Sequence, residues 1–257
     1  SGIITVCSIG LLFVPEKDSK EKINSQNIAD KKILDKIGVS NQFTKGFAWL
    51  YGTIVNPLLS FFKKNTISVA LSILGFVFLF KIGEAFLGRM SLVFYKEIGF
   101  SKTDIALYSK GIGWITTVTF TLLGGLFAVR MGLVKAMFLS GVFMALTNIL
   151  FSVLAWVGNS EILFAFTVLI DDLAAAFATV AFVGFISALV DRNYTATQYA
   201  LLASIGTLGR TLFASSSGMM VDWLNGNWII FFIITALMVI PSLIFLFLFR
   251  KKLNLNE

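Results

Sequence analysis

Lys81 and Glu84 stand three residues apart inside the long apolar stretch 67–95. On a helix this spacing puts both side chains on one face, which Gly88 continues. Charged groups in such a stretch cost free energy unless pairing or function keeps them there. Because removal from water favours the neutral form of a carboxyl group, Glu84 is a candidate proton carrier or cation anchor, with Lys81 tuning it. The alternative is a Lys81–Glu84 pair that only neutralises itself.

Two more acids, Asp171 and Asp172, lie in the middle of the apolar stretch 161–190. Neighbouring residues on a helix point about 100° apart, so both cannot face the same partner. We therefore expect at least one of them to face the interior and to serve transport or gating, and we group both with Glu84 as candidate proton-coupling residues.

Arg210 lies in the middle of the stretch 195–222. An unpaired guanidinium there is improbable, and Asp171, Asp172 and Glu84 are the available counter-ions. We expect Arg210 to pair with an acid of another span, with Asp171 and Asp172 as the first candidates, or else to bind an anionic solute.

Three further polar residues in apolar stretches are candidates for the wall of a solute pathway: Arg89, Lys110 and Gln198. Lys110 has a second interpretation, since a long lysine side chain can reach the outer membrane surface instead.

Several kinds of chemistry are excluded or disfavoured by composition. The chain has no histidine, so Ser-His and Cys-His catalysis and histidine metal sites are excluded, and its single cysteine, Cys7, allows no intramolecular disulfide. The acids are scattered over separate spans rather than clustered, so we expect no enzyme, no metal and no cofactor. The net charge of +7 lies in loops next to apolar stretches, where membrane proteins carry Lys and Arg, so we expect no nucleic-acid partner.

The elements that must position these residues are apolar stretches, each long enough to cross a bilayer, which requires about 20 residues. Hydrophobic residues make up 57% of the chain and charged residues 14%. Because lipid offers the backbone no water, such stretches must be helices, which predicts an all-α, polytopic membrane protein with a six-helix bundle. The stretches run roughly over residues 67–95, 103–130, 134–157, 161–190, 195–222 and 228–249.

Basic residues predict the orientation of these helices. Segment 15–66 holds nine lysines, and the 130–135, 191–194 and C-terminal segments on the same side are also basic. Cytoplasmic loops carry such an excess, so we expect segment 15–66 and the C-terminus in the cytoplasm.

The region before the bundle has three parts. Residues 1–14 are apolar but short, which suggests the end of a truncated transmembrane helix. Residues 15–66 are expected to form a cytoplasmic linker, and within it residues 43–62 carry apolar side chains at helical spacing. We expect an amphipathic helix there, interrupted near Pro57, that lies either on the membrane surface or on the protein's own cytoplasmic face.

A loop motif connects the helices 103–130 and 134–157. Gly125, Arg130, Gly132 and Lys135 follow the G-x-x-x-D-R-x-G-x-x-R/K pattern of the major facilitator superfamily, with Val129 in place of the Asp. These four residues are candidates for a gating loop. Six helices are also half of a common transporter plan, in which two six-helix halves enclose a central site.

The chain resembles the C-terminal half of AmpG-type muropeptide permeases, in the peptide/acetyl-CoA transporter branch of that superfamily. The resemblance covers roughly residues 54–257, with residues 67–257 as the six-helix half. It departs from the family at three positions: Glu84 stands where the family has Asp, Asp171 where it has Glu, and Asp172 where it has Asn. The matching stretches include FKIGEAF (80–86), KGIGWITT (110–117), DDLAAAFATVAFVGF (171–185), NYTATQYALL (193–202) and the GR at 209–210.

This resemblance implies proton-coupled import of anhydro-muropeptides across the bacterial inner membrane for peptidoglycan recycling. The partners would be the solute, protons, the bilayer and an N-terminal six-helix half. One alternative is a related transporter for another solute, such as acetyl-CoA, a peptide or a siderophore. Membrane-embedded enzymes and non-transporting sensors are further alternatives.

Overall fold

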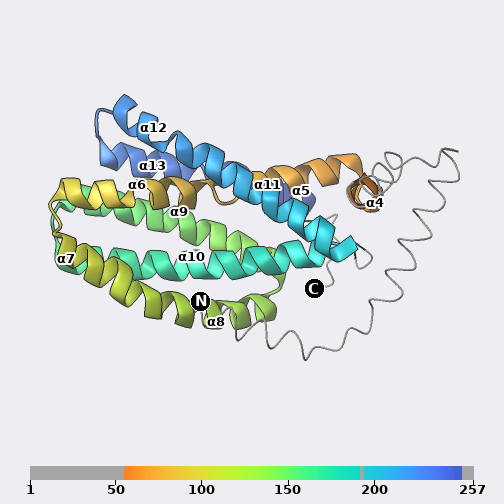
Figure 1. Ribbon diagram of the computed structural model, residues 1–257, viewed down its shortest axis with the longest axis horizontal. Coiled ribbons are helices and arrows are strands. Elements are labelled where there is room, and N and C mark those ends of the chain that lie inside the picture. Colours follow the sequence, from red (N-terminus) through yellow and green to blue (C-terminus); the bar gives the residue numbers. More distant parts are fainter. Residues whose placement is uncertain (1–54, 192–193, 251–257) are drawn as a thin grey trace, which may run out of the picture.

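The computed structural model describes residues 55–191 and 194–250, without the side chains of residues 110, 112 and 114. All regular structure in this part of the chain is helical, and the helices lie side by side along the longest axis of the molecule (Figure 1). The predicted all-α fold is therefore confirmed. The predicted helix end at 1–14 and most of the predicted linker lie outside the described residues.

Each predicted span corresponds to a helical rod. The first is α5 (Ile67–Leu79) followed by α6 (Ile82–Ile98); the second is α7 (Lys102–Ile105), the π-helical η2 (Ala106–Ile112) and α8 (Gly113–Met131). The third and fourth are α9 (Leu133–Val157) and α10 (Glu161–Leu189), the fifth is α11 (Thr195–Ser215) with α12 (Ser217–Trp223), and the sixth is α13 (Trp228–Leu237) with α14 (Ile240–Phe249).

Four of these rods are long and apolar enough to cross a membrane: Ile67–Ile98, Leu133–Val157, Glu161–Leu189 and Trp228–Phe249. The second and fifth rods, which we also predicted to be full spans, do not meet that criterion. In the second, the apolar helical part is shorter, Ile115–Met131. The fifth includes Gln198, Arg210 and many hydroxyl residues, which lower its hydropathy. Four apolar rods in one bundle make the chain a multi-pass membrane protein.

The bundle interior is filled by two hydrophobic clusters, one near each end. We call them the α4-end cluster, which includes Phe76, Phe185 and Phe249, and the α7-end cluster, which includes Phe94 and Phe232. Edge-on aromatic contacts join the rings within each cluster, for example Phe94 and Phe232 with centroids 4.7 Å apart. The boundary between the clusters runs across the middle of the long helices.

Helix α4 (Asn56–Lys64) covers one end of the bundle (Figure 1). Proline cannot donate a backbone hydrogen bond, and Pro57 stands in the first turn of α4, where none is needed. Phe61 is buried in the α4-end cluster, and Ser60 Oγ donates a 3.1 Å hydrogen bond to Asp191 Oδ2. In its described part, the predicted amphipathic helix thus packs on the protein's own surface. Residues 43–54 lie outside the described residues.

Two backbone features shape the rods: a break inside the first one and a one-residue turn between α8 and α9. The first rod is interrupted at Phe80–Lys81, so α6 begins in the middle of the bundle. The turn from α8 to α9 consists of Gly132 alone, with φ of +85°, a conformation that side chains with a Cβ rarely adopt.

Candidate functional site

The interruption of the first rod places Lys81 and Glu84 at the boundary between the two hydrophobic clusters. Phe80 belongs to the α4-end cluster and Ile82 to the α7-end cluster. Lys81 is the N-cap of α6, and Glu84 lies in the first turn of that helix. The partial positive charge at a helix N-terminus favours a carboxylate there, so the break itself helps to hold an acid at this depth.

Glu84 lies between two cations. Lys81 Nζ is 3.0 Å from Glu84 Oε2, and Arg210 Nη2 is 3.6 Å from Glu84 Oε1. Lys81 Nζ also donates a 2.9 Å hydrogen bond to Thr179 Oγ1 of α10. We call these four residues, Lys81, Glu84, Thr179 and Arg210, the Glu84 cluster; it joins three rods of the bundle.

The three charged side chains differ in their exposure. Those of Lys81 and Glu84 are 13% and 19% exposed, whereas the Arg210 side chain is 51% exposed. Two cations around one carboxylate leave one excess positive charge when Glu84 is ionised. Arg210 can therefore present its remaining donors to an anion outside the cluster.

Arg210 approaches Glu84 because α11 crosses α5 at very close range. Gly209 faces the Phe78 carbonyl so closely that a Cβ at position 209 would overlap it, and Gly206 faces Val77 and Phe182. Small residues at a crossing let two backbones approach. The partner of Arg210 differs from our expectation: it is Glu84, and not Asp171 or Asp172, because this crossing brings α11 to the start of α6.

Asp171 and Asp172 face different neighbours, as their 100° separation requires. Asp172 Oδ2 accepts a 2.8 Å hydrogen bond from Thr116 Oγ1 of α8, while Asp171 lies beside Thr147 of α9, whose hydroxyl donates to the Met144 carbonyl at 3.1 Å. Gly113 permits the first contact, since a Cβ there would stand 3.1 Å from Asp172 Oδ2. Asp172 also borders a cavity of about 200 Å³.

The remaining pathway candidates are not gathered around Glu84. Arg89 is exposed on α6, and the side chain of Lys110 lies outside the described part. Gln198 is buried; its Nε2 donates to the Pro57 carbonyl at 2.8 Å and its Oε1 accepts from the Asp191 amide at 2.6 Å. In this structure Gln198 thus ties α4 to the start of α11.

Three of the four gating-loop candidates lie at the α8–α9 turn, and Gly125 lies about two helical turns before it, within α8. Gly125 faces Val180 of α10, Gly132 is the turn residue itself, and Arg130 and Lys135 are exposed on either side of it. None of them contributes to the Glu84 cluster.

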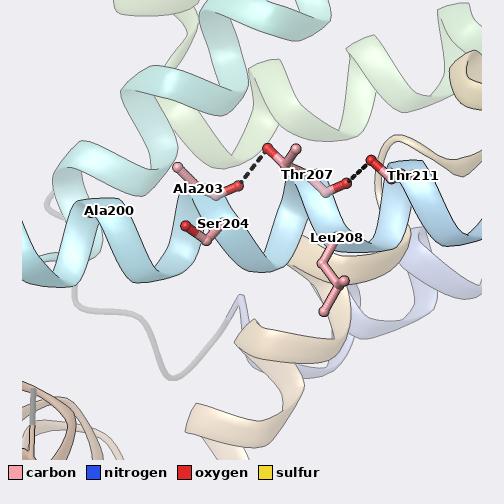
Figure 2. Close-up of a pocket in the computed structure, with 6 residues that line it drawn as sticks. All are labelled: Ala200, Ala203, Ser204, Thr207, Leu208 and Thr211. Carbon is pink, nitrogen blue, oxygen red and sulfur yellow. Dashed lines mark hydrogen bonds between the residues drawn. The ribbon is translucent and has the colours of Figure 1, made fainter.

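One face of α11 next to Arg210 carries small residues (Figure 2). The hydroxyls of Thr207 and Thr211 bond back to the carbonyls of Ala203 and Thr207, both at 2.9 Å, as the dashed lines in Figure 2 show. Because these hydroxyls donate to carbonyls of their own helix, the face is only weakly polar and carries mostly short side chains. Such a face is suited to contact with another helix. The other residues along this face are Ala200, Ser204 and Leu208.

The sequence alone did not single out Thr179 and Thr116, the hydroxyl partners of Lys81 and Asp172. Thr179 follows Asp172 by seven residues, a spacing that places both on the same side of α10 and could have pointed to it.

No family model matches the chain. It is 32% identical over 258 residues to "Putative transporter AmpG 4" of Rickettsia felis, and this match covers 98% of this chain and 55% of that protein. It is 31% identical over 256 residues to the protein of the same name in Rickettsia conorii, and this match covers 98% of this chain and 57% of that protein. It is also 27% identical over 202 residues to the "Anhydromuropeptide permease" of Escherichia coli K12, covering 78% of this chain and 40% of that protein. The chain spans little more than half the length of the Rickettsia relatives.

All of these relatives are named transporters or permeases, and none is named an enzyme. The similarity extends over nearly the whole chain and agrees with the helical membrane bundle. The chain is similar to AmpG-type transporters over nearly its whole length.

Proposed function

We propose that this chain forms the C-terminal half of a proton-coupled importer of anhydro-muropeptides in the bacterial inner membrane. The Escherichia coli relative carries that solute in its name. In this proposal an N-terminal six-helix half supplies the other wall of the pathway, and the small-residue face of α11 is suited to pack against it. The basic 15–66 segment and the C-terminus lie in the cytoplasm.

The observation that carries the coupling part of the proposal is the position of Glu84 between Lys81 and Arg210 at a break in a membrane rod. Transporters commonly bind solutes near mid-membrane where helices are interrupted. An ionised Glu84 holds Arg210 by charge attraction. Protonation of Glu84 removes that attraction and frees the guanidinium for a carboxylate of the solute.

Proton and solute would thus act on the same arginine. Muropeptides carry carboxylates, so the proton on Glu84 and the anion on Arg210 favour each other's binding. Asp171 and Asp172 belong to the same proposal as further proton-coupling residues, because on α10 they lie between the two hydrophobic clusters.

The test is uptake of labelled anhydro-muropeptide by the full-length protein at several external pH values, with and without Glu84→Gln. Glutamine keeps the shape of the side chain but cannot exchange a proton, so we expect uptake to lose its pH dependence and to fall at least tenfold. Glu161→Gln is the matched control, because Glu161 is exposed in the first turn of α10, away from the cluster. Unchanged uptake with unchanged pH dependence in Glu84→Gln would refute the coupling role. Failure of the wild-type protein to take up this solute would refute the proposed cargo.

A further inference from the structure

Two apolar grooves meet at the end of the bundle where α8 turns into α9. The α8 groove, of about 420 Å³, lies between α8, α9 and α10, and its walls include Phe120, Leu123 and Phe127. The α14 groove, of about 320 Å³, lies between the start of α9 and α14 and includes Phe138 and Phe247. Leu139 lines both grooves, so they are neighbours.

The α8 groove exists because α8 and α9 both pack mainly on α10 and only weakly on each other. Its lining runs along α8 from Phe120 to Arg130, which at 1.5 Å per residue is about 15 Å. That length is about half of the hydrocarbon core of a bilayer, the depth of one leaflet.

Cations stand at this same end of both grooves. Arg130, in the last turn of α8, is the charged residue of the α8 groove, and Lys135 and Arg250 line the α14 groove. The Arg250 guanidinium carbon lies 3.8 Å from the centroid of the Phe247 ring, a contact that holds the cation over the groove wall. Neither groove has an acidic residue among its described lining residues.

We propose that this place binds an anionic phospholipid, with its phosphate among Arg130, Lys135 and Arg250 and an acyl chain in each groove. Basic pockets between membrane helices are a known way to hold anionic headgroups. The groove walls away from the cations are hydrocarbon and aromatic, which suits acyl chains that need no hydrogen bonds. This inference concerns the lipid around the protein and does not depend on the solute carried.

The experiment measures binding of phosphatidylglycerol and phosphatidylcholine to the purified full-length protein in detergent by native mass spectrometry. We expect the protein to prefer phosphatidylglycerol. In the double variant Arg130→Gln/Arg250→Gln the preference should fall about 30-fold, the equivalent of about 1 kcal/mol for each of two cations. The charge-matched control is Lys96→Gln/Lys102→Gln, which removes two exposed cations near α7 and should keep the preference.

Two more variants keep the proposal testable if the double variant does not fold. Arg130→Lys/Arg250→Lys retains both charges and should retain the preference, whereas Leu139→Trp fills the shared wall and should weaken binding of both lipids. The proposal is wrong if wild-type protein binds the two lipids equally, or if the control lowers the preference as much as the Arg130/Arg250 variant. It is also wrong if Leu139→Trp changes neither affinity, or if inorganic phosphate displaces the lipid, since the site would then recognise a free anion. If the full-length protein binds neither lipid, because its other half covers the grooves, the proposal is also wrong.

Discussion

Glu84 is the residue on which the central cluster depends, because its single carboxylate faces two cations. If Glu84 loses its charge, Lys81 keeps a hydrogen bond to Thr179, whereas no other acid takes the place of Glu84 beside Arg210 in the described ion pairs. The two cations therefore respond differently to the same proton, and Arg210 is the one that becomes available.

Replacement of Arg210 by lysine separates recognition from charge balance. Arg210→Lys keeps the positive charge near Glu84 but loses the planar fork that can hold a carboxylate by two parallel hydrogen bonds. We expect the variant to unfold within a few degrees of wild type and the KM for uptake to rise about tenfold. Arg210→Gln, which also loses the charge, should impair uptake further. Wild-type KM in Arg210→Lys would show that the arginine serves charge balance alone.

At the level of elements, the close crossing of α11 and α5 is what assembles the cluster. Gly209 faces a backbone carbonyl, which cannot rotate away as a flexible side chain would. The crossing therefore leaves no room for a side chain at position 209. Because Gly209 allows α11 to approach α5 this closely, it helps to place the guanidinium of the neighbouring Arg210 beside Glu84.

Gly209→Ala should destabilise the bundle by about 1–3 kcal/mol, the usual cost of overpacking a tight interior. Gly218→Ala is the matched control, since it is also helical and a Cβ there would stand 3.7 Å from the nearest side-chain atom, in Met90. The measurement is thermal unfolding of both variants in detergent. Equal midpoints would mean that the helices can separate at this crossing without loss of stability.

The sequence predicted the rods well and their interruptions poorly. The predicted 134–157, 161–190 and 228–249 correspond to Leu133–Val157, Glu161–Leu189 and to α13 with α14. Apolar runs define such limits, because a span must match the bilayer. The break at Phe80–Lys81 and the π-helical η2 lie inside apolar runs, where the pattern of hydrophobic residues does not change.

Site geometry was predictable only where it is local. The Lys81–Glu84 contact follows from a three-residue spacing on one helix. The partner of Arg210 depends instead on where two rods cross. Gly209 permits this crossing, but in the sequence it is one of several small residues and nothing distinguishes it from the others. Hydroxyl partners such as Thr179 were missed for the same reason.

In the whole molecule, a polar layer divides the hydrophobic interior at mid-depth. Along α9, Met144 belongs to the α4-end cluster and Phe151 to the α7-end cluster, and the buried Thr147 and Asn148 lie between them. Lys81, Asp171 and Asp172 also lie between residues of the two clusters in their own rods. Each long helix is thus anchored at both ends by apolar packing and carries its polar groups in between.

The break at Phe80–Lys81 means that the first membrane rod is two short helices with separate hydrogen-bond ladders. The first hydrogen bond of α6 joins the Ala85 amide to the Lys81 carbonyl at 3.0 Å, so the amides of residues 82–84 come before the first hydrogen bond of this helix. In hydrogen–deuterium exchange we expect peptides over residues 80–84 to take up deuterium faster than those over 70–76 or 86–95, giving a fast-exchanging window inside a slow span. Equal protection along the whole rod would contradict this. Such a window would let the two halves of one membrane crossing tilt separately, with Glu84 carried by the half nearer α7.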